Sequence, residues 1–86
     1  MPSGFSNQNE LLLLIYKKVM ETIPDREKIP VYVFRNKLMN LRFKASDGVD
    51  PRYFTIRISR RDANILIDIM TEYGLIRRNH QWILLQ

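Results

Sequence analysis

The segment from Ser59 to Gly74 restricts the fold of this chain more than any other, because it carries signals for the start, the buried face and the end of one helix. Ser59 stands three residues before Asp62, which is the spacing of a capping box with Asp in place of the preferred Glu. Apolar side chains then recur at helical spacing: Ala63, Leu66, Ile67, Met70 and Tyr73. Gly74 suits the left-handed position that ends a helix. The sequence therefore predicts a helix over residues 59–73.

A β-hairpin is predicted directly after this helix, over residues 75–85. Leu75–Ile76 and Gln81–Leu85 have the length and apolar content of short strands. We expect the turn at Arg78-Asn79-His80 or a neighbouring pair, since Asn tolerates the positive φ that such turns need.

Two further helices are predicted before residue 42. The first runs from Asn7 to Ile23, after a possible N-cap at Ser6, and its core face is formed by Leu12, Ile15, Tyr16, Val19 and Ile23. The second runs from Pro30 to about Leu41, with Val31, Phe34, Leu38 and Leu41 on one side. Residues 24–29 (PDREKI) are expected to be a charged connection.

The stretch from Arg42 to Pro51 is the least regular and contains the turn signal Asp47-Gly48. Tyr53 to Ile58 (YFTIRI) then alternates aromatic and β-branched residues, which favours a short strand. The expected order is helix, helix, strand, helix, strand, strand. This order predicts one α+β domain over residues 1–86, with residues 1–5 disordered.

Composition excludes most catalytic and cofactor chemistry. The chain has no cysteine, and His80 is its only histidine. It has no Gly-rich loop followed by Lys-Ser/Thr, and its local acidic pairs lack a third ligand. We therefore expect no enzyme, no metal and no cofactor, and no effector pocket is apparent from the sequence. The longest apolar run, Leu11 to Tyr16, is too short to span a bilayer, and the absence of a basic leader predicts an intracellular, cytoplasmic protein.

The charge balance points to nucleic acid as the partner. Fourteen Lys and Arg residues against nine Asp and Glu give a net charge of +5. A basic balance in a small domain is the electrostatic footprint of a nucleic-acid binder.

The stretch ISRRDANILIDIMTEYGLIRRNHQWILL, residues 58–85, resembles the recognition helix and wing of winged helix-turn-helix proteins. The shared features are the Ser-started helix, its apolar stripe, the Glu-Tyr-Gly exit, the Leu-Ile strand and the basic hairpin. The resemblance implies sequence-specific binding of double-stranded DNA, as in a transcription regulator. The chain is also similar to small DNA-binding proteins of archaeal viruses and plasmids in size, isoleucine content and lack of cysteine.

One feature departs from that family. Its members generally place the first strand before the second helix and join the second and third helices by a tight turn. Here the whole stretch from Arg42 to Ile58 intervenes. Either the first strand has moved into this stretch, or the stretch hides another helical turn.

Arg60, Arg61 and Asn64 are the predicted base-reading residues, because they lie in the first turn and a half of the helix that would enter the major groove. Arg donates bidentately to guanine, and Asn pairs with adenine. The alternative is that these side chains form an ordinary solvated helix face.

Contacts to the DNA backbone, including those made by the hairpin that would act as the wing, are predicted for the remaining basic side chains around this helix. They are Arg57, Arg77, Arg78 and His80, with Arg35 and Lys37 on the second helix beside Tyr32 and Asn36. Alternatively the hairpin arginines only keep an edge strand soluble, and His80 is a plain turn residue. Trp82 alternates with Leu84, so we expect it in the core beneath the hairpin rather than as a base-stacking platform.

Leu11 and Leu14 lie beside the buried stripe of the first helix, and they predict a homodimer formed largely through that helix. The alternative is that they cover the back of the domain. Two other functions stay open at this point. One is a winged-helix protein-interaction module without DNA readout, and the other is RNA binding with Tyr53 and Phe54 stacked on bases.

Overall fold

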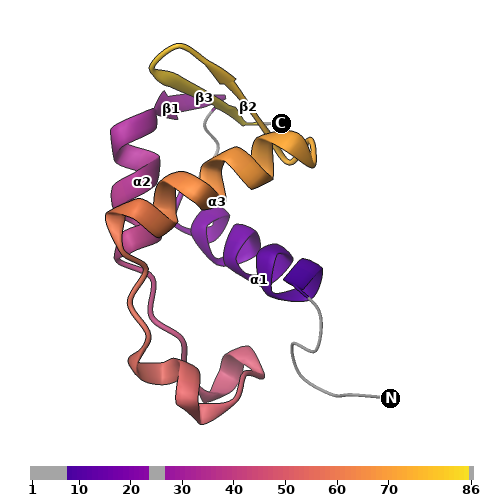
Figure 1. Cartoon of the computed structure of the whole chain (residues 1–86), viewed down its shortest axis with the longest axis vertical. Coiled ribbons are helices and arrows are strands. Elements are labelled where there is room, and N and C mark those ends of the chain that lie inside the picture. The colour runs from indigo at the N-terminus through magenta and orange to yellow at the C-terminus, as the bar shows by residue number, and fades with distance from the viewer. Residues whose placement is uncertain (1–7, 24–26, 86) are drawn as a thin grey trace.

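The computed structural model describes residues 8–23 and 27–85. Its elements follow in the order α1 (Gln8–Glu21), β1 (Lys28–Pro30), α2 (Val31–Met39), α3 (Arg60–Glu72), β2 (Ile76–Asn79) and β3 (Trp82–Leu85) (Figure 1). Two short 3₁₀ helices, η1 (Ala45–Asp47) and η2 (Pro51–Thr55), lie between α2 and α3. The strands form one antiparallel sheet in the order β1-β3-β2. The fold class is therefore α+β and consistent with a winged helix, as predicted.

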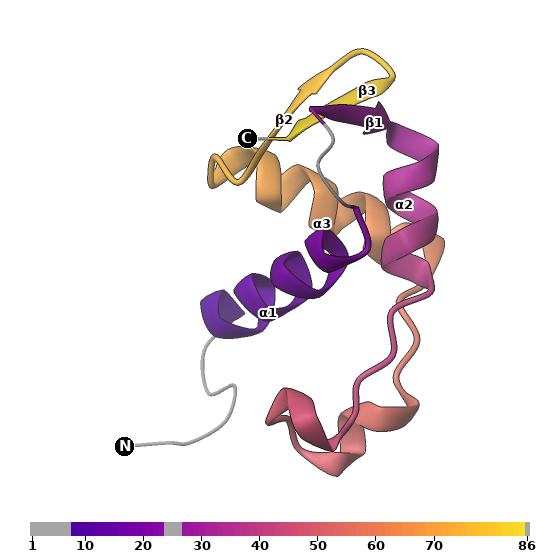
Figure 2. The ribbon, with the colours of Figure 1, turned by 180° about the vertical axis from the view of Figure 1, so that it is seen from behind.

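The sheet and the long α2–α3 connection lie at opposite ends of the molecule (Figure 1). The three helices fill the space between them. In Figure 1 α3 crosses in front, and in the reverse view of Figure 2 α1 is nearer the viewer than α3. The outward surfaces of α1 and α3 therefore face opposite sides of the molecule.

The core is built from the helical stripes and from one face of the sheet. The largest fully buried side chains are Val19, Phe34, Leu38, Ile67, Met70, Ile76 and Ile83. They come from all three helices and from both strands of the hairpin. The apolar periodicity thus predicted the buried faces of α1, α2 and α3, except that Tyr73, expected in the buried stripe of α3, is 56% exposed.

Both ends of α3 are held as predicted. At the start, the Ser59 hydroxyl accepts a hydrogen bond from the Asp62 backbone N–H at 3.1 Å. At the end, Gly74 has φ +77°, and the Leu75 N–H donates to the Met70 carbonyl at 2.9 Å. This second bond and the one from Gly74 to Thr71 form a Schellman motif, which stops the helix where the hairpin begins.

The first strand was missed by the sequence analysis, which expected only a connection over residues 24–29. Residues 24–26 lie outside the described part, but Lys28–Pro30 form β1 and pair with β3, Ile29 opposite Ile83. The Val31 N–H extends the pairing by donating to the Gln81 carbonyl at 2.8 Å. β1 therefore precedes α2, where the winged-helix pattern has its first strand.

The predicted strand over Tyr53–Ile58 is wrong. Residues 51–55 form η2, and residues 56–59 are extended without a strand partner. The reason lies at the start of η2, where the Asp50 carboxylate accepts the Arg52 N–H at 2.8 Å and Pro51 has a fixed φ. These local signals outweigh the β propensity of the side chains that follow. The second of the two explanations for this stretch, hidden helical turns, is therefore correct.

The α2–α3 connection is fastened to α1 by one ion pair. Lys18 Nζ lies 2.9 Å from Asp47 Oδ2, and it also lies 5.8 Å from the centre of the Phe43 ring. The hydrogen bond from Lys18 holds the pKa of the Asp47 carboxyl below its ordinary value. Phe43, Val49 and Ile58 are buried, so the connection has an apolar anchor of its own.

Candidate nucleic-acid interface

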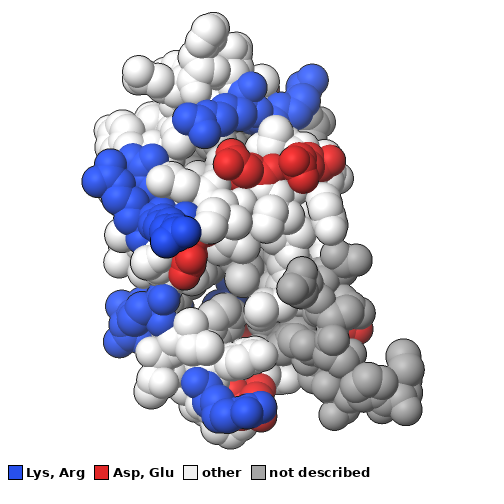
Figure 3. All heavy atoms as spheres, in the orientation of Figure 1, with Lys and Arg blue, Asp and Glu red and all other residues white. Residues whose placement is uncertain are grey.

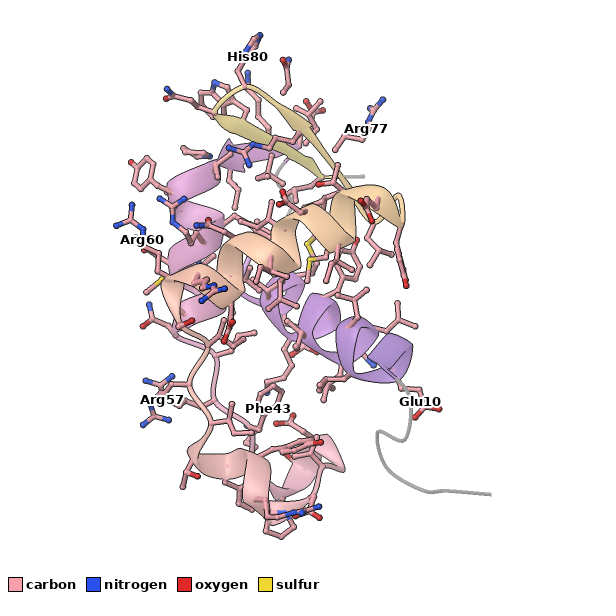
Figure 4. All side chains as sticks on the ribbon, in the orientation of Figure 1. Glu10, Phe43, Arg57, Arg60, Arg77 and His80 are labelled. Carbon is pink, nitrogen blue, oxygen red and sulfur yellow. The ribbon has the colours of Figure 1, made fainter. Side chains whose placement is uncertain are left out.

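The start of α3 presents two arginines to solvent. Arg60 and Arg61 are both exposed, and within residues 8–23 and 27–85 neither guanidinium makes an ion pair or a hydrogen bond. Figure 4 shows Arg60 pointing away from the body of the molecule. Both exposed side chains are therefore available to a ligand.

Asn64, the third predicted reading residue, is held by a residue of α2. Arg35 Nη1 donates to Asn64 Oδ1 at 3.3 Å. Because a guanidinium has only donors, this contact orients the amide oxygen toward α2 and leaves the Asn64 NH₂ group free to donate elsewhere. Arg35, which was predicted to contact the DNA backbone, is therefore hydrogen-bonded to one of the predicted base-reading residues.

Charge divides along α3. On the face drawn in Figure 3, basic side chains gather along the edge formed by α2 and the start of α3, and acidic side chains lie over the second half of α3. The acidic residues there are Asp68 and Glu72, both exposed. The first turn of α3 also carries one exposed acidic residue, Asp62, but together with α2 it has more basic than acidic side chains and so attracts a polyanion, which Asp68 and Glu72 repel.

Arg57 and Lys37 differ in their surroundings. Arg57 is exposed in the extended segment before α3, and in Figure 4 it points outward on the same side as Arg60. Lys37 Nζ donates to the Thr22 carbonyl at 3.1 Å, next to the last turn of α1. Lys37 thus has a structural role at the end of α1.

The hairpin carries Arg77, Arg78 and His80, all exposed. The turn consists of His80 and Gln81, and the positive φ of 58° belongs to His80, whereas the sequence analysis had assigned it to Asn79. Arg78 Nε donates to the His80 carbonyl at 3.2 Å, so this arginine also holds the turn. In Figure 4 the side chains of Arg77 and His80 point away from the sheet.

The prediction that Trp82 packs in the core is wrong. Trp82 is 42% exposed, and its neighbours Ile83 and Leu85 face the helices instead. Lys28 Nζ lies 4.6 Å from the centre of the Trp82 ring, a cation–π contact. A cavity of about 400 Å³ beside it is lined by Tyr32, Arg35, Arg78 and Trp82 among others. The exposed aromatic surface at this end of α2 and β3 is a feature that the sequence analysis did not find.

An apolar cavity of about 440 Å³ lies between α1, the α2–α3 connection and α3. Leu11, Phe43, Ile56, Ile65 and Asp62 are among the residues that line it. No such pocket was apparent from the sequence, because the cavity depends on the path of the α2–α3 connection, of which only residues 53–58 were assigned a structure, a strand.

Other classes of site are not found in the part of the chain that the structure describes. No group of three or more His, Asp or Glu side chains there could hold a metal ion. None of the described helices has both the length and the apolar character needed to cross a bilayer. Comparisons of the chain with protein-family models, with curated proteins and with solved structures give no match.

Proposed function

We propose that this protein binds double-stranded DNA sequence-specifically as a transcriptional regulator, with the start of α3 in the major groove. The observation that carries the proposal is the pair of exposed, unpaired arginines at the N-terminus of a capped helix, Arg60 and Arg61. An α-helix fits the major groove, and residues at its N-terminus reach the base edges.

Base reading is assigned to Arg60, Arg61 and Asn64. Each arginine has the donor geometry for guanine O6 and N7. Asn64 offers its NH₂ group, because its oxygen already accepts from Arg35. Asn64 therefore donates to a purine N7, and Arg35 acts as a positioning residue for this contact.

Phosphate contacts are assigned to Arg57 in front of α3 and to Arg77 and Arg78 on the hairpin. Arg57 precedes α3, whereas Arg77 and Arg78 lie on the hairpin that follows it, and all three are exposed. Such contacts position the duplex without reading its sequence. The acidic second half of α3 would then point out of the groove.

The test is a selection from random duplexes, followed by fluorescence anisotropy on the selected and on a scrambled duplex. Arg60→Ala is expected to weaken binding to the selected duplex by roughly 1–3 kcal/mol and to relax preference at one base position. Arg35→Ala should change preference at the base that Asn64 contacts. Arg52→Ala removes one arginine from η2, at the far end of the molecule from the hairpin, and is the matched control.

Three outcomes separate the proposal from its alternatives. An equal loss on both duplexes would make Arg60 a phosphate contact. Tighter binding to single-stranded RNA than to any duplex would favour RNA recognition, although Tyr53 and Phe54 are half-buried and offer little ring surface for stacking. Failure to bind any nucleic acid would favour a protein-interaction module, for which the exposed Ile56 and Ile65 beside the apolar cavity are the specific observation.

A further inference from the structure

The outward side of α1 combines leucines with opposite charges. Glu10, Leu13, Leu14 and Lys17 recur at helical spacing on the side opposite the buried Leu12, Ile15 and Val19. Leu13 is 51% exposed, Leu14 is half-buried, and the two charged residues are exposed. We call these four residues the α1 outer face.

We propose that the α1 outer face joins two copies of this chain, with the two α1 helices antiparallel about a two-fold axis between Leu13 and Leu14. In this register Leu13 faces Leu14 of the second copy. Glu10 and Lys17 lie at equal distances on either side of the axis, about 5 Å along the helix at a rise of 1.5 Å per residue. Each Glu10 therefore faces a Lys17, and the contact has an apolar centre between two ion pairs.

The occupant is a second copy because the charge pattern is self-complementary. A two-fold interface uses the same surface on both subunits, so a residue i that contacts j must be matched by j contacting i. Glu10 and Lys17, placed symmetrically about the leucine pair, meet this condition when the two α1 helices are antiparallel. If the helices were parallel, like charges would face each other. Each copy has a net charge of +5, so the two ion pairs also offset a general repulsion.

One further leucine of α1 lies outside this contact. Leu11, which was predicted at the dimer interface together with Leu14, lies on the flank of α1 and lines a second apolar cavity of about 450 Å³ that reaches Ile69 and Tyr73 of α3. Tyr73 is 56% exposed there. α3 lies in front in Figure 1 and α1 lies in front in Figure 2, so a dimer formed through α1 leaves Arg60 and Arg61, at the start of α3, accessible. The inference does not depend on DNA binding.

The test is the dissociation constant of the dimer, measured by sedimentation on the full chain without nucleic acid. Lys17→Glu is expected to raise this constant at least tenfold, because two like-charge contacts replace two ion pairs. The double variant Glu10→Lys/Lys17→Glu restores the pairs in reversed order and should return the constant to within about threefold of the original. Arg52→Glu changes the net charge equally in η2, outside α1, and it should leave the constant nearly unchanged.

Folding is checked on the same samples by circular dichroism. Glu10→Lys places a positive charge in the first turn of α1, which lowers helix stability. Recovery of the dimer in the double variant therefore cannot come from a more stable helix. Leu13→Gln, at a half-exposed position, should disrupt the dimer while the monomer stays folded. A protein that is monomeric at high micromolar concentration, or a double variant no better than Lys17→Glu alone, would overturn the proposal.

Discussion

At the scale of single residues, one ion pair connects segments that are far apart in the sequence. Lys18 of α1 and Asp47 of η1 have side chains only 14% and 12% exposed, so their contact is largely removed from solvent. The Asp47 carboxylate also accepts the Lys44 backbone N–H at 2.8 Å. By contrast, Asp50 and Arg52 pair at the surface, where Arg52 is 83% exposed and screening by water weakens the attraction. The two pairs allow a matched comparison.

We expect Asp47→Asn to lower the free energy of unfolding at pH 7 by about 1 kcal/mol, the usual contribution of one hydrogen bond. Because the pKa of Asp47 is lowered in the folded state, its contribution is complete above the ordinary value of 3.8 and is lost as the pH falls through the folded-state pKa. The difference between Asp47→Asn and the parent chain should therefore shrink in strong acid. Urea unfolding at several pH values measures it, with Asp50→Asn as the control that should change less. Equal effects of both substitutions would contradict this account.

At the scale of elements, those defined by residues close together in the sequence could be predicted. Those that depend on a partner far away in the sequence could not. α3 and the hairpin were predictable because Ser59, the apolar stripe and Gly74 are local signals. β1 has one buried residue, Ile29, and its partner strand ends the described chain, so no local pattern reveals it. Trp82 was misplaced because Trp-Ile-Leu-Leu is apolar throughout. Only its pairing with β1 determines which residues face the helices.

The candidate nucleic-acid interface shows the same difference between local and long-range signals. The exposure of Arg60, Arg61 and Asn64 could be read from the helical stripe of α3, because a residue off the stripe faces outward. The hydrogen bond from Arg35 to Asn64 could not be predicted from the sequence, because it depends on how closely α2 and α3 pack. The apolar cavity beside α1 depends in turn on the path of residues 42–58, which is determined by Asp50-Pro51 and by the Lys18–Asp47 pair.

The N-cap of α3 gives a prediction at this scale. Ser59→Ala removes the hydroxyl that accepts the Asp62 N–H, and we expect it to lower the free energy of unfolding by about 1 kcal/mol. Ser59→Asp keeps an acceptor at the same position and should restore most of the loss. Thermal unfolding of the three proteins measures the effect. If the Asp variant were as unstable as the Ala variant, the hydroxyl would have to act through something other than the cap.

At the scale of the whole molecule, the face drawn in Figure 3 carries basic side chains along α2 and the start of α3 and also on the hairpin. Lys37 is engaged at Thr22 and Arg35 at Asn64, so the arginines assigned to phosphate contacts are Arg57, Arg77 and Arg78. If each neutralises one phosphate, the logarithm of the binding constant should fall with the logarithm of salt concentration with a slope of about −2.7 per protomer. Anisotropy titrations on a single half-site and on an inverted repeat measure this slope.

The slope also links DNA binding to the proposed dimer. Two protomers held by the α1 outer face on an inverted repeat should give about twice the slope of one protomer on a half-site, because twice as many counterions are released. Arg57→Ala should reduce the half-site slope by about one, and Arg52→Ala in η2 should leave it unchanged. Lys17→Glu should bring the inverted-repeat slope at low protein concentration down to the half-site value, while the half-site slope itself is kept. A doubled slope that survives Lys17→Glu would mean that the DNA, and not α1, brings the two protomers together.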